Sequence, residues 1–207
     1  MRLVQTKIIS GGDNEEAVRA FEPIKQEITA AIAKVVNPAG ASDFAINPIR
    51  EGNGVVPLKR AFIEHLEERG WLTERGFDGK VPKKIRGESS MGAIDAFRPL
   101  QGNLGAFAIE WETGNISSSH RAVNKMCSGI LDGLLFGGAL VLPSRTMYQY
   151  LTDRIGSYQE LASYFNLWGR IPFPQPSILA VFEVEHDRID AGVPLLKKGK
   201  SGNAKKD

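Results

Sequence analysis

Hydrophobic residues follow a helical spacing in some stretches and a strand spacing in others, and the two patterns alternate along the chain. Helices are predicted over residues 13–36, 57–69, 117–135 and 144–165, the last with a break near Gly156. Strands are predicted over residues 93–97, 105–113, 138–142 and 177–184, with a short one at 44–46. We therefore expect one α/β domain over residues 1–207, a central mixed β-sheet flanked by helices. The lysine-rich residues 197–207 are expected to form a flexible tail.

The composition is that of an ordinary globular protein, with 42% hydrophobic and 24% charged residues in a chain of 207. It excludes a disordered chain, a collagen-like repeat and a coiled coil. A single cysteine excludes a disulfide framework and a cysteine-rich zinc site. The longest apolar run, Ile130–Pro143, is too short and too interrupted to span a bilayer, and residues 1–12 do not resemble a signal peptide. A cytoplasmic protein without membrane contact is expected.

Three acidic residues on two neighbouring predicted strands form the main candidate for chemistry. Strand alternation places Glu110 and Glu112 on one face, about 7 Å apart. If that strand pairs with the one that carries Asp95, three carboxylates converge. Clustered carboxylates repel one another unless a cation is present, and hard divalent cations such as Mg²⁺ prefer oxygen ligands. Such a site suits phosphodiester hydrolysis, in which a carboxylate accepts the proton of the attacking water.

Two other interpretations of these acids stay open on spacing alone. A Glu-x-Glu pattern on a half-exposed strand is most often a solvated surface. A pair of carboxylates of the glycosidase kind is also compatible with the spacing. The net charge of +2 argues against nucleic-acid binding through bulk charge. It is, however, the sum of an acidic pocket and of basic segments at residues 80–86 and 197–206.

A longer pattern surrounds these acids. The stretch from Phe107 to Arg121, with Asn124 and Lys125 after it, resembles the core of the BamHI-like branch of the PD-(D/E)xK nucleases. Further matching stretches occur in the same order, at residues 53–59, 94–95, 150–154, 160–165 and 193–195. In this branch a Glu replaces the usual motif Lys. The resemblance implies a restriction endonuclease-like fold.

The resemblance also implies a role for each residue of the catalytic site. The metal ligands would be the carboxylates of Glu74, Asp95 and Glu110 and the backbone carbonyl of Trp111. Glu112 would be the general base, and Lys59 a basic residue near the scissile phosphate. The loop between Asp95 and Glu110 is slightly shorter than in the family, which could shift these acids relative to each other.

Base recognition is implied at five positions, which are Asn115, Ser117, Arg121, Asp153 and Arg154. Arginine donates to guanine O6 and N7, and aspartate accepts from cytosine N4. The five together imply a GC-rich six-base palindrome, GGATCC. Without the resemblance, Asn115 and Ser117 would be read as helix caps, and Asp153 and Arg154 as a surface ion pair.

The resemblance therefore implies a type II restriction endonuclease of a bacterial cytoplasm. It would depend on Mg²⁺, with Mn²⁺ as a substitute, and would leave 5′ overhangs in double-stranded DNA. A palindrome implies a homodimer, and the predicted helix 117–135 is the expected interface. A cognate DNA methyltransferase would be its genetic partner. The alternatives are a member of the fold that binds DNA without cutting it, or one with relaxed specificity. Residues 199–202 lack the family's acidic minor-groove residue.

Overall fold

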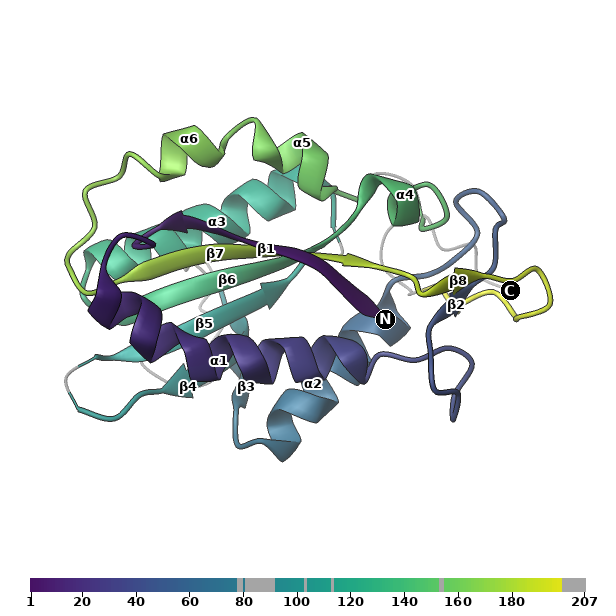
Figure 1. Cartoon of the computed structure of the whole chain (residues 1–207), viewed down its shortest axis with the longest axis horizontal. Helices are drawn as coiled ribbons and strands as arrows, with labels where there is room; N and C mark the ends of the chain where they lie inside the picture. The colour runs from purple at the N-terminus through teal and green to yellow at the C-terminus, as the bar shows by residue number, and fades with distance from the viewer. Residues whose placement is uncertain (78–79, 81–91, 103, 113, 153–154, 199–207) are drawn as a thin grey trace, which may run out of the picture.

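A mixed β-sheet runs through the middle of the protein (Figure 1). The computed structural model describes residues 1–77, 80, 92–102, 104–112, 114–152 and 155–198. Within these residues the sheet has six strands, in the order β1 (Arg2–Ser10), β7 (Ile178–Glu185), β6 (Leu135–Pro143), β5 (Ala106–Trp111), β4 (Ile94–Pro99) and β3 (Leu72–Arg75). The neighbours β5, β6 and β7 are parallel, and the other pairs are antiparallel. The predicted α/β class and mixed sheet are confirmed.

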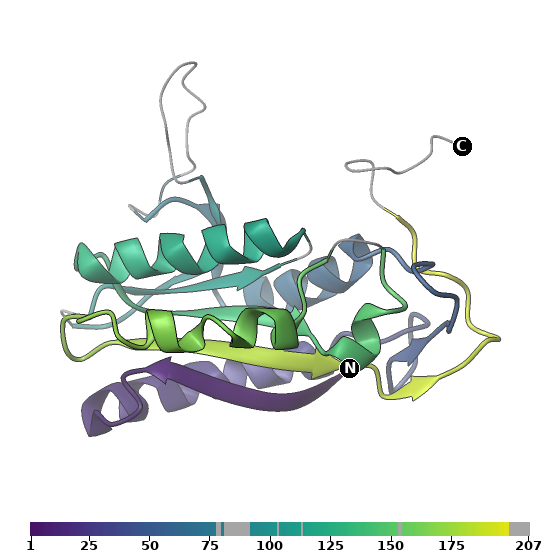
Figure 2. The ribbon, with the colours of Figure 1, turned by 90° about the horizontal axis from the view of Figure 1, so that it is seen from above.

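Helices cover both faces of this sheet. One face packs against α1 (Glu15–Ala33) and α2 (Val56–Glu68), and the other against α3 (Ile116–Leu131), α5 (Tyr158–Ala162) and α6 (Phe165–Trp168). In Figure 1, α1 lies in front of the sheet and α3 behind it, and Figure 2 shows the two from above. The first core includes Phe62 of α2 against Trp111, with ring centroids 4.8 Å apart. The second includes Met126 of α3, which lies next to Gly138 of β6.

Two edge strands were not predicted from the sequence. β1 is partly exposed along most of its length, so it lacks the alternation of buried and exposed residues that marks a half-buried strand. β3 lies in a stretch read as a loop, and its four residues are exposed or half-buried. Strands at the edge of a sheet pair on one side only, and their composition is therefore less constrained by burial.

A break at Gly156 is confirmed in the predicted helix 144–165, but it is wider than predicted and spans residues 149–157, and the helical residues around it form three short helices. They are α4 (Arg145–Tyr148), α5 and α6. A Cβ atom on Gly156 would lie 2.6 Å from the Ser119 hydroxyl, so the chain passes closely over α3 between α4 and α5. The helix predicted over 117–135 ends earlier, at Leu131, since Gly133 takes a left-handed turn (φ 69°) before β6.

The carboxyl-terminal segment returns to the loop that precedes α2. There β2 (Ala45–Ile46) pairs with β8 (Arg188–Ile189), and the Gly54 amide donates to the Leu196 carbonyl at 2.8 Å. The buried Asn53 amide donates to the carbonyls of Asn47 and Tyr150. Lys197 and Lys198 of the predicted tail lie against Gly54, and residues 199–207 are outside the described residues. Among the described helices, none is both long and apolar enough to cross a bilayer.

Candidate active site

The antiparallel pairing of β4 and β5 brings two carboxylates together. Ala96 is opposite Ile109, which is the last pair of the ladder. The next residue on each strand, Asp95 on β4 and Glu110 on β5, therefore lies beside the other. The Trp111 amide donates to Oδ2 of Asp95 at 2.9 Å. Both acids are 7% exposed. Two carboxylates at this depth need a compensating positive charge, because burial in a medium of low dielectric disfavours their ionised form.

Two lysines supply that charge. Lys59 of α2 places its Nζ 2.5 Å from Oδ1 of Asp95. Lys125 of α3 forms an ion pair with Glu110, and its Nζ also donates to the Ala93 carbonyl at 2.7 Å. In the protein without metal, each buried carboxylate therefore has its own ammonium group.

The pKa values of Glu110 and Lys59 are shifted from their ordinary values. Burial, and then the charge of Asp95, raises the pKa of Glu110 to about 8 from its ordinary 4.5, against the opposing effect of Lys125. Burial lowers the pKa of Lys59, but the attraction of Asp95, with smaller effects of Glu110 and Glu74, outweighs it and leaves the pKa raised. Perturbations of this kind are typical of functional sites, although structural ion pairs produce them too.

These groups line a cavity of about 220 Å³, together with the predicted base Glu112. Glu112 follows directly after β5, and its Oε1 accepts a hydrogen bond from the Gly114 amide at 2.6 Å. The full lining is Lys59, Ala93, Asp95, Glu110, Trp111, Glu112, Ser118, Arg121, Ala122 and Lys125. Five of the six residues predicted for catalysis and metal binding are thus brought together.

Glu74, the sixth, lies at the rim of this arrangement. The strand register places it across from Asp95, between the pairs Thr73–Ala96 and Arg75–Ile94. Its side chain is exposed, its φ is 50°, and it does not line the cavity, but its charge acts on Lys59. Glu74 is therefore on the strand next to Asp95, but its side chain does not line the cavity that holds Asp95 and Glu110.

The donor set fits a hard divalent cation with few protein ligands. Within the described ranges, no three His, Cys, Asp or Glu side chains are close enough together to hold an ion. Mg²⁺ commonly binds through one or two carboxylates and completes its shell with water and substrate phosphate. Asp95 and Glu110 supply two carboxylates, at a position where each already attracts an ammonium group.

The predicted base-reading residues lie at the start of α3, next to the cavity. Asn115 caps this helix, since its Oδ1 accepts from the Ser118 amide at 3.1 Å, and Asn115, Ser117 and Arg121 are exposed. Capping uses one acceptor of Asn115 and does not bury its side chain. Asp153 and Arg154 are outside the described residues.

In the predicted helix 117–135, the expected dimer interface, the spacing of Met126, Ile130, Leu131 and Leu134 is compatible with either the core or a dimer face, and the structure divides them into two groups. Met126 and Ile130 belong to the core beneath the helix, whereas Leu131 and, just after it, Leu134 are exposed. Met126 and Ile130 are therefore core residues, and of these four only Leu131 and Leu134 are available on the surface for an interface.

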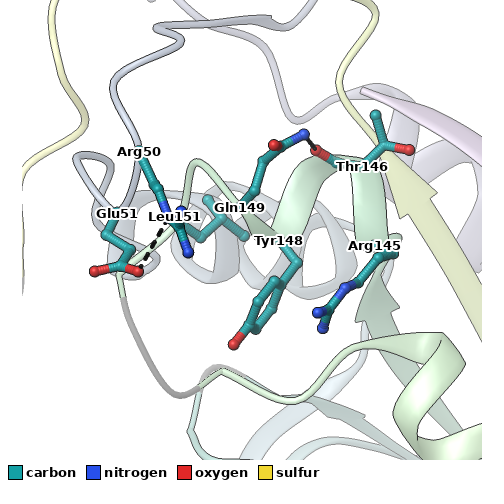
Figure 3. A pocket seen from close by; sticks show the side chains of 7 residues that line it. All are labelled: Arg50, Glu51, Arg145, Thr146, Tyr148, Gln149 and Leu151. Carbon is teal, nitrogen blue, oxygen red and sulfur yellow. Dashed lines mark hydrogen bonds and ion pairs between the residues drawn. The ribbon is translucent and has the colours of Figure 1, made fainter.

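Sequence reasoning missed two features of this end of the molecule. The first is the pairing of Lys125 with Glu110, which strand alternation alone does not reveal because it depends on how α3 packs. The second is a larger cavity, about 500 Å³, between α4 and the loop before α2 (Figure 3). Arg50 and Arg145 line it, and the Arg145 guanidinium lies over the Tyr148 ring, 4.9 Å from its centre. Leu151 borders both this cavity and a small hollow next to Glu112.

Comparisons with known proteins agree with this architecture. Residues 1–203 match the family described as "Restriction endonuclease BamHI". The type II restriction enzyme OkrAI of Oceanobacter kriegii is 46% identical over 191 residues, which cover 92% of this chain and 94% of that enzyme. The type II restriction enzyme BamHI of Bacillus amyloliquefaciens is 34% identical over 184 residues, 87% of this chain and 82% of that enzyme.

A solved structure shares the fold at low sequence identity. Restriction endonuclease BglII complexed with a DNA 16-mer superposes with a TM-score of 0.61 at 10% identity, over 90% of this chain and 79% of that one. The predicted restriction endonuclease-like fold is confirmed by this likeness. The family match over residues 1–203, together with the two similar enzymes, shows that the chain belongs to the BamHI family of type II restriction endonucleases.

Proposed function

We propose that this protein is a Mg²⁺-dependent homodimer that cuts double-stranded DNA at GGATCC and leaves 5′ overhangs, with Mn²⁺ as a substitute metal. The observation that carries the proposal is the continuity between the carboxylate cavity and the start of α3. Glu110 and Glu112 lie at the end of β5, and the exposed Asn115 and Arg121 follow on the next element. One continuous segment thus presents groups for hydrolysis beside groups for base recognition. Membership of the family supports the same reading.

Each residue has a distinct role in the proposed reaction. Asp95, Glu110 and the Trp111 carbonyl would hold the cation, with Glu74 at the rim. A bound Mg²⁺ polarises the scissile phosphate and lowers the pKa of water. Glu112 accepts the proton of the attacking water, because the hydrogen bond from Gly114 keeps its carboxylate at the cavity. The Lys59 ammonium offsets the negative charge that develops on the phosphate.

Base recognition follows the chemistry of the exposed polar groups. Arg121 and Arg154 are suited to guanine, Asp153 to cytosine, and the Asn115 amide and Ser117 hydroxyl can both donate and accept. A palindromic site requires the same groups twice, in a twofold arrangement, which two copies of the chain supply. Leu131 at the end of α3 and Leu134 just after it are exposed apolar residues available for that interface. A DNA methyltransferase that protects the same site is the proposed genetic partner.

The cavity of Figure 3 offers contacts with the DNA backbone outside the base-reading segment. Arg50 and Arg145 face it with exposed guanidinium groups. It adjoins the hollow next to Glu112 through Leu151, at the same end of the sheet. We assign it to phosphates that flank the recognition site, since arginine binds phosphate in two parallel hydrogen bonds.

The direct test is digestion of a plasmid that contains one GGATCC, with a matched plasmid in which the site is changed by one base pair. A single linear product with Mg²⁺ from the first plasmid only, and sequenced ends with 5′ extensions, is expected. No discrete product over a range of salt concentrations would contradict the proposal. Specific binding in Ca²⁺ without cutting in Mg²⁺ would favour a silent member of the fold. Ends at several different sequences would favour relaxed specificity.

A further inference from the structure

Lys125 joins the two strands that carry the candidate metal ligands. Its Nζ pairs with Glu110 on β5 and donates to the carbonyl of Ala93, two residues before Asp95 on β4, at 2.7 Å. The side chain rises from α3 and is 11% exposed, so water has little access to its ammonium group. One buried ammonium group therefore holds both the Glu110 carboxylate and the backbone just before β4.

Lys59 differs from Lys125 in its surroundings. The Lys59 side chain is 32% exposed, and the contacts that the structure gives its ammonium group are with Asp95. Its ammonium group is partly in contact with water, so it can turn toward a phosphate in the cavity while the Trp111 amide still donates to Asp95. Lys125 has no comparable freedom, because a backbone carbonyl and a buried carboxylate hold it from two sides. The two ammonium groups are thus suited to different tasks.

A divalent cation that binds Glu110 meets the Lys125 charge at close range. Like charges a few ångströms apart repel strongly in a partly buried site, because the effective dielectric constant there is well below that of water. The same ammonium group stabilises the carboxylate when no cation is there, since an unpaired buried charge is strongly destabilising. Lys125 therefore stabilises the protein without a cation and opposes the binding of a cation.

We propose that Lys125 is a positioning residue that serves as the resident counterion of Glu110 and weakens divalent-cation binding by the free protein. The inference rests on the proposed function, because it takes Asp95 and Glu110 as the metal ligands. A DNA phosphate brought to the cavity adds negative charge and offsets the repulsion. Metal binding then becomes favourable after DNA has bound, and the free enzyme stays largely without metal.

The test is Mn²⁺ binding to the protein without DNA, measured by isothermal titration calorimetry. Lys125→Met, similar in length but uncharged, is expected to bind Mn²⁺ about tenfold more tightly or better. Lys125→Arg keeps the charge and should stay near the wild-type affinity. Lys25→Met on α1, which removes a half-exposed lysine that pairs with Glu22, is the matched control. Lys125→Gln, which keeps a hydrogen-bond donor without the charge, replaces Lys125→Met if the latter does not fold.

Thermal unfolding without metal provides the second readout. Lys125→Met should have a lower Tm than the wild type and a larger rise in Tm with Mn²⁺. A lower Tm with unchanged or weaker Mn²⁺ affinity would mean a merely structural role and would overturn the inference. If neither wild type nor variants bind Mn²⁺ without DNA, the counterion role fails, and if added DNA also gives no Mn²⁺ binding that Asp95→Asn abolishes, the proposed metal site itself fails. If they bind Mn²⁺ without DNA, and the Lys125 variants do not differ, only the counterion role fails.

Discussion

Lys59 and Lys125 approach the same pair of carboxylates from opposite faces of the sheet, one from α2 and the other from α3. The four groups form a row in the order ammonium, carboxylate, carboxylate, ammonium, with Asp95 and Glu110 in the middle. The row is electrically balanced when both acids are ionised. The protein without metal can therefore bury two neighbouring acids, an arrangement that two carboxylates alone would make strongly unfavourable.

The stability of the metal-free protein should depend on pH through Glu110. Its pKa in the folded state is about 8, above the ordinary 4.5, so the folded state holds a proton that the unfolded state releases. This contribution to stability is fully present below pH 4.5 and is lost as the pH rises through 8. We expect Tm in EDTA to fall between pH 5.5 and 8 for the wild type, and to fall less for Glu110→Gln.

Differential scanning calorimetry at several pH values measures this difference. Glu64→Gln, which removes an exposed carboxylate of α2, is the control and should follow the wild-type curve. Parallel curves for the wild type and Glu110→Gln would show that Glu110 ionises normally in the folded protein.

Replacement of Glu112 should separate cutting from binding. Glu112→Ala removes the proposed base, and general-base catalysis contributes about 10²–10⁴-fold to a rate. We expect single-turnover cleavage to fall by at least that factor, while specific DNA affinity in Ca²⁺ stays close to that of the wild type. A fall in affinity as large as the fall in rate would assign Glu112 to binding instead.

Arg145 should contribute affinity without sequence preference. Arg145→Ala is expected to weaken specific and non-specific binding to a similar extent, and to reduce the slope of log K against log salt by about 0.9. Arg170→Ala is the matched control, since this arginine lines a separate cavity between α6 and β1. A loss confined to one base pair of the site would show that Arg145 reads sequence.

Arg154 should behave in the opposite way. The sequence resemblance assigns it to an outer base pair, so Arg154→Ala should cost about 1–3 kcal/mol of specific binding and relax discrimination at that pair. Competition binding against each single-base variant of GGATCC measures it. An equal loss for every sequence would mean that Arg154 contacts only phosphate.

The sequence predicts the interior of this fold better than its edges. β5 and β7 have strong hydrophobic patterns because both faces are covered, whereas β1 and β3 show weak patterns because an edge strand has little to bury. The sequence predicts a helix over residues 144–165 with a break near Gly156, but local spacing cannot register how closely Gly156 passes over α3 and therefore how wide the break is. That contact belongs to the tertiary structure.

The candidate site divides in a similar way. Strand alternation was enough to suggest that Asp95, Glu110 and Glu112 meet, and the resemblance added Lys59 and the role of Glu112 as general base. Neither assigned a role to Lys125, since its partner on β5 depends on how α3 packs against the sheet. Glu74 was placed among the ligands by resemblance, and the structure puts it at the rim on an edge strand.

The position of β7 has a consequence for how the protein is made. This late strand lies between β1, the earliest one, and β6. A growing chain therefore carries β1 without its sheet partner, and β6 with an open apolar edge, until residues 178–185 have left the ribosome. We expect chains that stop before β7 to be degraded rather than to fold as active fragments. The assembled active site would then exist only in complete chains.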